Sequence, residues 1–179
     1  PDSDNNALLF KQGQMNVLQP LIDKGKIKIT ATLTMEDWGE IGALMKVDEF
    51  LYTSKQKPAA IIASNDALAS GSIQALPADM RGKTVITGQD ADLTALKYII
   101  AGTQSMTIYK PIKPLAQLAG ETAIKLAKGE AVANKTKMTS ENVTVDAILL
   151  DPIAVDKLNF KETVVKDGHV SLSELMDKK

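Results

Sequence analysis

Short apolar segments that alternate with helical patterns are the feature that most constrains how this chain can fold. Residues 59–64, 84–88 and 105–110 predict strands, and residues 67–76 and 93–100 have helical spacing between them. A strand, a helix and another strand in this order favour a parallel sheet, because the helix carries the chain back to the edge where the first strand began. Such strands are buried on both faces and are therefore apolar. The predicted fold class is α/β, with a doubly wound parallel sheet.

Three further elements are predicted before this alternation. A helix begins at the polar residues 4–6 and stops at Gly25, because glycine commonly follows the last helical turn. Residues 26–34, with the sequence KIKITATLT, alternate between polar and apolar side chains and predict a strand. Residues 36–52 carry apolar side chains at helical spacing and predict a second helix.

The sequence after Lys110 is less regular. Residues 115–128 predict an alanine-rich helix, and residues 130–145 predict a loop. Residues 146–155 predict a strand in which a proline favours a position at a sheet edge. The tail that follows predicts a short strand or turn and a final short helix.

Composition narrows the function classes. The chain has 21 basic and 22 acidic residues, so it has no net field to attract nucleic acid or an acidic membrane surface. Cysteine is absent, which excludes thiolate catalysis, and the single histidine, His169, argues against a metal site built from histidines and is expected at the surface. No glycine-rich phosphate-binding signature is present. We therefore expect a neutral ligand, no metal and no cofactor.

Polar residues follow three of the predicted strands. Asn65, Asp90 and Lys110 each stand at or just beyond the end of a strand, and Asp4 opens the first helix. In open α/β sheets, ligands bind outside the carboxyl ends of the strands. Carboxylates, amides and an ammonium group suit a polyhydroxylated neutral molecule, because each hydroxyl can both donate and accept. Trp38 offers a flat apolar face against which a sugar ring can pack.

Each of these residues also has a structural interpretation. Asn65 or Asp66 is a typical helix N-cap residue, and capping is compatible with ligand binding. Asp90 can simply precede a helix, where a carboxylate is favoured by the helix dipole. Lys110 can be a solvated loop lysine, and Trp38 can be partly buried core.

A family resemblance sharpens these alternatives. The segments DNNALLFKQGQM, DWGE, ASNDALASGSIQAL, GQDADL and AGTQSMTIYKPI resemble the periplasmic sugar-binding proteins of the ribose/galactose type, which serve ABC importers, and within them the branch that binds D-xylose. The resemblance spans nearly the whole chain and is densest before Pro111. It implies the type I periplasmic-binding-protein fold, in which two lobes joined by three crossings clamp a sugar. It also implies a location in the periplasm or on the outer face of a bacterial membrane.

The resemblance assigns a ligand-binding set of six residues: Asp4, Asn6, Trp38, Asn65, Asp90 and Lys110. In this set the ring of Trp38 stacks on the sugar, Asp90 accepts hydrogen bonds from hydroxyls, and Lys110 donates them. Asn65 faces the sugar, while Ser64 or Asp66 stabilises the start of the next helix.

The resemblance also implies how the chain is divided. Residues 1–110 would form the core of the carboxyl-terminal sugar-binding lobe, residues 111–150 would be crossover elements belonging with an amino-terminal lobe, and residues 151–179 would return and form the tail. Without that amino-terminal lobe the helix at residues 115–128 would expose its apolar face. We expect a separate polypeptide, or a preceding segment, to supply the other lobe.

The function predicted from the sequence is therefore binding, not catalysis. The chain is expected to bind a monosaccharide, a pentose and most specifically D-xylose, and the closed form would be recognised by an ABC permease or by the sensor domain of a membrane kinase. An alternative is the effector-binding domain of a sugar-responsive transcription regulator. A third interpretation, an α/β hydrolase that uses Asp90 and Lys110, lacks a nucleophile elbow and a second histidine.

Overall fold

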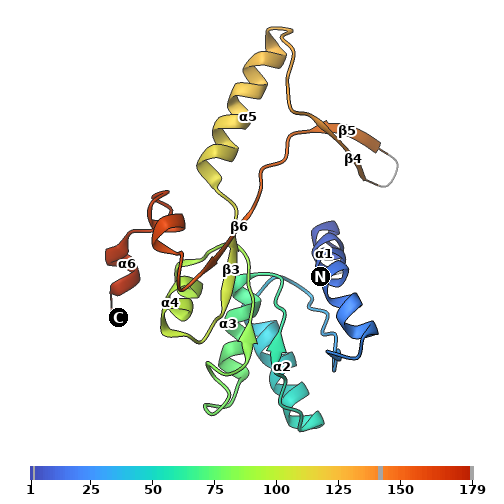
Figure 1. Ribbon diagram of the computed structural model, residues 1–179, viewed down its shortest axis with the longest axis vertical. Helices are drawn as coiled ribbons and strands as arrows, with labels where there is room; N and C mark the ends of the chain where they lie inside the picture. The colour runs from blue at the N-terminus through green and yellow to red at the C-terminus, as the bar shows by residue number, and fades with distance from the viewer. Residues whose placement is uncertain (2, 141–142, 178–179) are drawn as a thin grey trace. The chain divides into compact units, whose positions relative to one another are not determined.

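In the computed structural model, which describes residues 1, 3–140 and 143–177, the chain divides into two units (Figure 1). The first comprises Pro1–Ile108 and Ala154–Lys179, and the second comprises Tyr109–Ile153. In chain order the helices and strands are α1 (Asn5–Asp23), α2 (Glu40–Ser54), β1 (Ala60–Ile61), α3 (Asp66–Ala75), β2 (Val85–Ile86), α4 (Leu93–Ala101), β3 (Met106–Tyr109), α5 (Ile112–Ala127), β4 (Thr136–Ser140), β5 (Val143–Ala147), β6 (Ile153–Asp156), the π-helix η1 (Lys161–Val165) and α6 (Leu172–Met176). Among the described residues, no helix is both long and apolar enough to cross a membrane.

Short parallel strands form the centre of the first unit. β1 pairs with β2 in parallel, with Ala60 opposite Val85. Backbone hydrogen bonds continue from the end of β2 to β3, where the amide of Ile108 donates to the carbonyl of Gly88 over 3.1 Å. β3 also pairs with β6. The predicted α/β alternation is therefore confirmed, although the regular strands are shorter than the apolar segments suggested.

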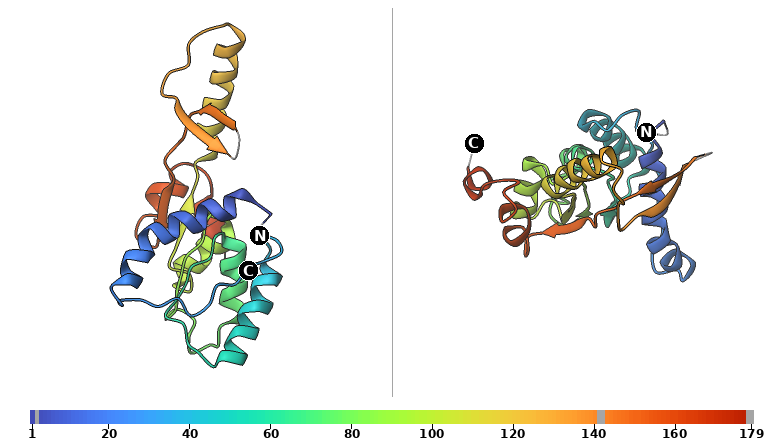
Figure 2. Two further views of the ribbon diagram at one scale, coloured as in Figure 1. Left: turned by 90° about the vertical axis from the view of Figure 1, so that its right-hand side faces the viewer. Right: turned by 90° about the horizontal axis from the view of Figure 1, so that it is seen from above.

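The main core lies where α3 packs against α2. The two helices run side by side in both views of the fold (Figures 1 and 2). Gly71 permits this approach, because a Cβ atom there would lie 2.1 Å from the carbonyl oxygen of Glu40. Ala43 on α2 and Ala69 on α3 are fully buried in the contact. Small residues at the crossing thus bring the backbones together and fix the position of the amino-terminal end of α3.

Further buried residues lie on α4, which packs against α6, and on the carboxyl-terminal tail. Leu96 of α4, Val155 of β6 and Val164 of η1 have no exposed surface, and Leu175 of α6 is 5% exposed. Because these side chains come from widely separated parts of the sequence, their burial ties the tail into the first unit.

The second unit consists of α5 and an antiparallel hairpin of β4 and β5. Thr139 pairs with Thr144, and their hydroxyls lie 2.9 Å apart. Lys135 and Lys137 both contact the carboxylate of Asp146 on the facing strand, at 2.7 and 2.5 Å. The prediction of a loop over residues 130–145 was therefore wrong. On one face of the hairpin, cross-strand hydroxyl and ion pairs stabilise the pairing, while on the other face Met138 pairs with Val145 and both stay exposed.

The segment at residues 26–34 also differs from the prediction. All of these residues are described, and they form no strand. Their alternation is real, but a strand requires a paired neighbour, and Ile27, Ile29 and Leu33 stay 38 to 44% exposed. The preceding helix α1 begins and ends as predicted, with Gly25 at a φ of 65° just beyond it, yet it buries none of its residues.

Candidate functional site

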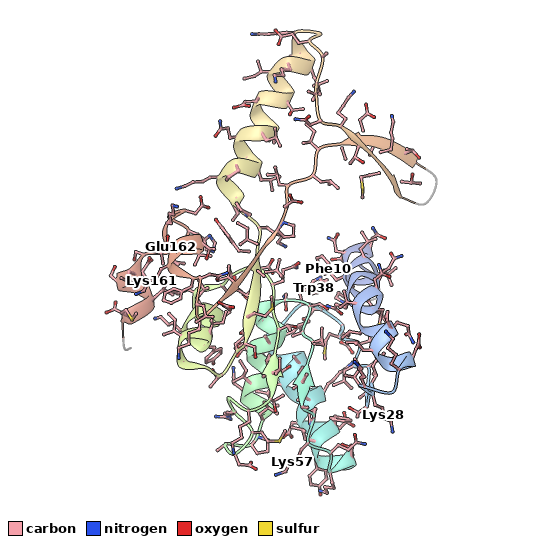
Figure 3. The ribbon with its side chains drawn as sticks, in the orientation of Figure 1. Phe10, Lys28, Trp38, Lys57, Lys161 and Glu162 are labelled. Carbon is pink, nitrogen blue, oxygen red and sulfur yellow. The ribbon has the colours of Figure 1, made fainter. Side chains whose placement is uncertain are left out.

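Trp38 connects the first helix to the centre of the first unit. Its indole nitrogen donates to Oδ2 of Asp4 over 3.0 Å, and its ring meets the edge of Phe10 with centroids 6.2 Å apart (Figure 3). The ring is partly buried and packs against the core around α3. Asp4 caps α1 at the same time, because its Oδ1 accepts from the amide of Asn6 over 2.8 Å. These contacts hold one aromatic face and one carboxylate together.

Asn65 lies beside this pair and is itself the cap of α3. Its Oδ1 accepts from the amide of Leu68 over 2.8 Å, and its Nδ2 donates to the carbonyl of Trp38 over 3.1 Å. The interpretation of Asn65 as an N-cap residue is therefore confirmed, and the alternative that Ser64 or Asp66 caps α3 was wrong. Asn65 does so because its extended backbone places its short side chain over the first turn of the helix. An asparagine side chain offers two donor hydrogens and two acceptor lone pairs, so these contacts leave half of its capacity for a ligand.

Two other predicted residues are exposed. Asn6 is the second residue of α1, and its amide is used in the cap. Lys110 directly follows β3 and belongs to the second unit, whereas the other predicted site residues belong to the first. The structure thus brings together Asp4, Trp38 and Asn65 within the first unit.

Asp90 stands on a strained turn at the end of the neighbouring strand segment. Its φ is 105°, and that of the next residue, Ala91, is 57°, a region that residues with side chains seldom adopt. Such a backbone costs about 1–3 kcal/mol and persists only where its surroundings fix it. Here the amide of Asp90 donates to the carbonyl of Ile108 over 2.8 Å, and the amide of Ala91 donates to the Thr107 hydroxyl over 3.2 Å. We call residues 90–92 the Asp90 turn.

A buried carboxylate lies directly behind this turn. Asp66, 2% exposed, accepts on Oδ1 from Nε2 of Gln104 over 2.9 Å and from the hydroxyl of Thr107 over 2.8 Å. Its Oδ2 accepts from the amide of Asp92 over 2.9 Å. Burial raises the pKa of Asp66 to about 6, although these donors oppose the shift. The pKa of Asp92 is also raised, first by burial and then by the charge of Asp90.

The carboxyl-terminal tail contacts the same turn. Nε2 of His169 donates to the carbonyl of Ala91 over 3.0 Å, and the ring is partly buried. The expectation that His169 is a surface residue was therefore wrong, because the tail folds back onto the end of the strand segment. Neither this contact nor the bonds from Gln104 and Thr107 to Asp66 were expected from the sequence, although the resemblance implied a supporting or capping role for Asp66. Gln104 and Thr107 lie in the segment AGTQSMTIYK, which carried the resemblance.

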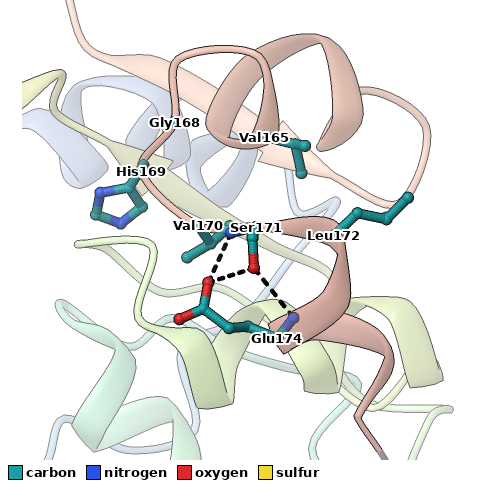
Figure 4. Close-up of a pocket in the computed structure, with 7 residues that line it drawn as sticks. All are labelled: Val165, Gly168, His169, Val170, Ser171, Leu172 and Glu174. Carbon is teal, nitrogen blue, oxygen red and sulfur yellow. Dashed lines mark hydrogen bonds between the residues drawn. The ribbon is translucent and has the colours of Figure 1, made fainter.

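A pocket of about 440 Å³ opens next to His169 in the tail (Figure 4). Its polar lining is His169, which contacts Ala91, together with Ser171 and Glu174, which form a capping box at the start of α6. The Ser171 hydroxyl donates to Oε2 of Glu174 over 2.6 Å and accepts from the amide of Glu174 over 3.2 Å. Because these groups are engaged with each other, we assign no ligand to the pocket. Within the described residues, no group of three or more metal-ligating side chains is present either.

Short parallel strands with flanking helices define an open α/β protein, a class in which ligands bind outside the carboxyl ends of the strands. The model of the periplasmic binding protein domain matches residues 1–131, and the chain belongs to that family. The expected type I periplasmic-binding-protein fold is thus confirmed. A carbohydrate transporter solute-binding protein from Chloroflexus aurantiacus, solved in complex with D-glucose, matches with a TM-score of 0.84 and 27% identity, over 97% of this chain and 59% of that one.

Two curated relatives are more similar in sequence. The D-xylose-binding periplasmic protein of Haemophilus influenzae is 49% identical over 92% of this chain and 50% of its own length. The protein of the same name from Escherichia coli is 47% identical over 96% of this chain and 52% of its own length. The predicted resemblance is therefore confirmed. The chain spans about half the length of the curated relatives it matches.

Proposed function

We propose that this chain forms one side of a binding site for a monosaccharide, with D-xylose as the first candidate. The observation that carries the proposal is the cluster of Asp4, Trp38 and Asn65, in which an aromatic ring, a carboxylate and an amide are held by mutual hydrogen bonds. A sugar presents apolar C–H groups on its ring faces and hydroxyls at its rim, and this combination of side chains suits both. The similarity to D-xylose-binding relatives favours a pentose.

Asp90 and Lys110 complete the proposed set with Asn6. Asp90 is presented by a backbone that hydrogen bonds within the protein hold in place, and such preorganisation lowers the entropy lost on binding. In this proposal Asp90 accepts from sugar hydroxyls, and Lys110 and Asn6 donate to sugar oxygens. The location proposed for the chain is the periplasm or the outer face of a bacterial membrane.

The proposed partner of this site is a second lobe. The matched relatives are about twice as long as this chain, which supports a site completed by a further segment or a separate chain. Closure of the two lobes around the sugar would create the form that a membrane partner recognises, which we propose to be an ABC permease or a membrane sensor kinase. The chain itself would bind its ligand without chemical turnover.

Calorimetric titration tests the proposal. The chain is titrated with xylose, ribose, arabinose and glucose, both alone and joined to the amino-terminal half of a D-xylose-binding relative. We expect the joined protein to bind xylose most tightly, and Asp90→Ala to weaken that binding. Asp79→Ala is the matched control, because Asp79 is an exposed carboxylate that pairs with Lys57. The proposal fails if the joined protein binds none of the four sugars, or if Asp90→Ala binds as tightly as the parent.

A further inference from the structure

We infer that Asp66 is a positioning residue: its buried carboxylate, acting with Thr107 and Gln104, fixes the Asp90 turn and so determines where Asp90 is presented to a ligand. The part of this inference that concerns ligand binding by Asp90 rests on the proposed sugar-binding function. Its structural part, that Asp66 holds residues 90–92, stands independently of that function.

The hydrogen bonds show how a carboxylate at position 66 orders this turn. Oδ2 of Asp66 accepts directly from the amide of Asp92 over 2.9 Å. Oδ1 accepts the Thr107 hydroxyl proton over 2.8 Å, so the hydroxyl lone pairs are left to accept from the amide of Ala91 over 3.2 Å. The Asp66 carboxylate therefore holds two successive amides of the turn. It accepts directly from the amide of Asp92, and it orients the Thr107 hydroxyl that accepts from the amide of Ala91.

Asp66 is available for this task because it does not cap its own helix. The cap of α3 is Asn65, whose Oδ1 accepts from Leu68. An acidic residue in the first turn of a helix is ordinarily exposed and serves the helix dipole. Asp66 is instead 2% exposed, and its carboxylate accepts hydrogen bonds from Asp92, Gln104 and Thr107, which all lie outside α3. Burying a charge in this way is costly unless donors surround it, and three donors do.

The surroundings are shaped to a carboxylate at this position. A Cβ atom on Gly88 would lie 2.0 Å from Oδ1 of Asp66 and 2.6 Å from Nε2 of Gln104, so the strand end is kept free of a side chain. Gln104 turns its Nε2 toward Asp66 and toward the carbonyl of Met106, at 2.9 and 3.1 Å. Its Oε1 is the buried side-chain atom without a partner among the described residues. Rotating the side-chain amide of Gln104 by 180° would point Oε1 at the oxygens of Asp66 and Met106. The side chain therefore donates to Asp66 and leaves its own Oε1 without a hydrogen bond.

The first test is a double-mutant cycle on sugar binding, measured by calorimetry with the joined protein and xylose. Asp66→Asn keeps the shape but replaces one acceptor with a donor, and we expect it to weaken binding about tenfold or more. In an Asp90→Ala background the same change should have little further effect, because its action passes through Asp90. In a Trp38→Ala background it should retain its full effect. Equal effects of Asp66→Asn in the parent and Asp90→Ala backgrounds, or unchanged binding, would overturn the inference.

The second test needs no sugar. Amide hydrogen exchange at residues 90–92 is measured by NMR in the parent chain, Asp66→Asn, Thr107→Val and Thr107→Ser. We expect faster exchange at residues 90–92 in the first two variants, unchanged protection within α3, and parent-like exchange in Thr107→Ser, which keeps the hydroxyl. Thr107→Val leaves the carboxylate in place and decides the matter if Asp66→Asn does not fold. Parent-like exchange in Thr107→Val would reject the inference, whereas absence of sugar binding by the parent would reject only the proposed function.

Discussion

Each unit of the chain contains a helix with apolar side chains at helical spacing, but the helix is buried in the first unit and exposed in the second. In the first unit α3 buries most of its length, including Ala69 and Ile73 at 0 and 3% exposure. In the second unit α5 is 16 residues long and buries none of them, and Leu115 and Leu126 remain 51 and 64% exposed. The difference lies not in helical spacing but in what is available to pack against, since most helical stability in proteins comes from tertiary contacts.

The exposed face of α5 is also hollowed. An open cavity of about 450 Å³ lies within the second unit, between the helix and residues 146–148, with Leu118, Ala123 and Leu126 among its lining residues. A contiguous apolar surface of this kind marks a site of contact with another element. The assignment of residues 111–150 to a second lobe remains a prediction, although the unit Tyr109–Ile153 has nearly the same bounds.

The largest expected effect is a contrast between two leucines. Leu96→Ala removes a fully buried side chain in the first unit and should lower the free energy of unfolding by about 2–5 kcal/mol. Leu126→Ala changes a side chain that is 64% exposed and should alter it by less than about 0.5 kcal/mol. Urea unfolding of the chain alone measures both. Equal losses would mean that α5 is as well packed as α4, and the contrast between the units would be lost.

The next effect concerns pH and belongs to the first unit. The pKa of Asp66 is about 6 in the folded chain, above its ordinary value of 3.8, so the folded state binds the proton more tightly than the unfolded state does. Stability is therefore greatest below about pH 4 for this group and falls as the pH rises through 6, by about 3 kcal/mol in all. The raised pKa of Asp92 acts in the same direction. Urea unfolding from pH 4 to 7 measures the slope.

Asp66→Asn is the variant that isolates this dependence. It removes the titrating group, so its free energy of unfolding should change less between pH 4 and 7 than that of the parent. The exposed Asp23→Asn, whose carboxylate contacts Gln19, is the matched control and should leave the slope unchanged. An identical slope in the parent and Asp66→Asn would contradict the assignment of this titration to Asp66.

A smaller effect is expected at the helix starts. Asn65→Ala removes the side-chain cap of α3 and should cost about 1 kcal/mol. Asn65→Asp keeps an acceptor for the Leu68 amide and should recover part of the loss. The helix of the second unit, α5, starts at Ile112 after Pro111 and has no side-chain cap, and Gln117→Ala on its exposed surface should have little effect. Thermal unfolding measures all three, and an Asn65→Ala midpoint equal to that of Gln117→Ala would refute the capping role.

The smallest effect lies in the hairpin of the second unit. Lys135 and Lys137 hold the pKa of Asp146 at about 2, so these ion pairs are present above its ordinary value of 3.8 and are lost as the pH falls through 2. Asp146→Asn should leave the global unfolding midpoint unchanged, because both partners are at the surface. NMR titration checks the pKa, which should rise toward 3.8 in high salt. No response to salt would argue against the ion pairs.

The sequence was informative where local and tertiary preferences agree. Apart from residues 26–34, the order of helices and strands through Tyr109 followed from apolar spacing. Polar residues before α1, α3 and α4 marked where those three helices begin. Residues 26–34 were mispredicted because alternating polar and apolar side chains are compatible with a strand but do not indicate whether a neighbouring strand is present to pair with it. The β4–β5 hairpin was missed because its stability comes from pairs such as Thr139 with Thr144, which no single strand reveals.

The candidate site was predictable to a similar extent. Strand ends pointed to Asn65, Asp90 and Lys110, the start of the first helix pointed to Asp4, and the resemblance added Asn6. The resemblance implied a supporting or capping role for Asp66, but not its contacts, because an aspartate after Asn65 has the same local pattern whether it is exposed or buried. Only the packing of α3 against α2 and the approach of Thr107 and Gln104 distinguish the two cases.

The strained turn at Asp90 bears on the speed of recognition. A turn that must first be ordered slows productive encounters, because only the ordered fraction of molecules can capture a ligand. In this chain the unusual backbone of Asp90 and Ala91 is held by hydrogen bonds from within the protein, which involve Asp66, Thr107 and His169. Under the proposed function, the rate of sugar capture is therefore expected to depend on diffusion and on movement of the proposed second lobe, and not on formation of this turn.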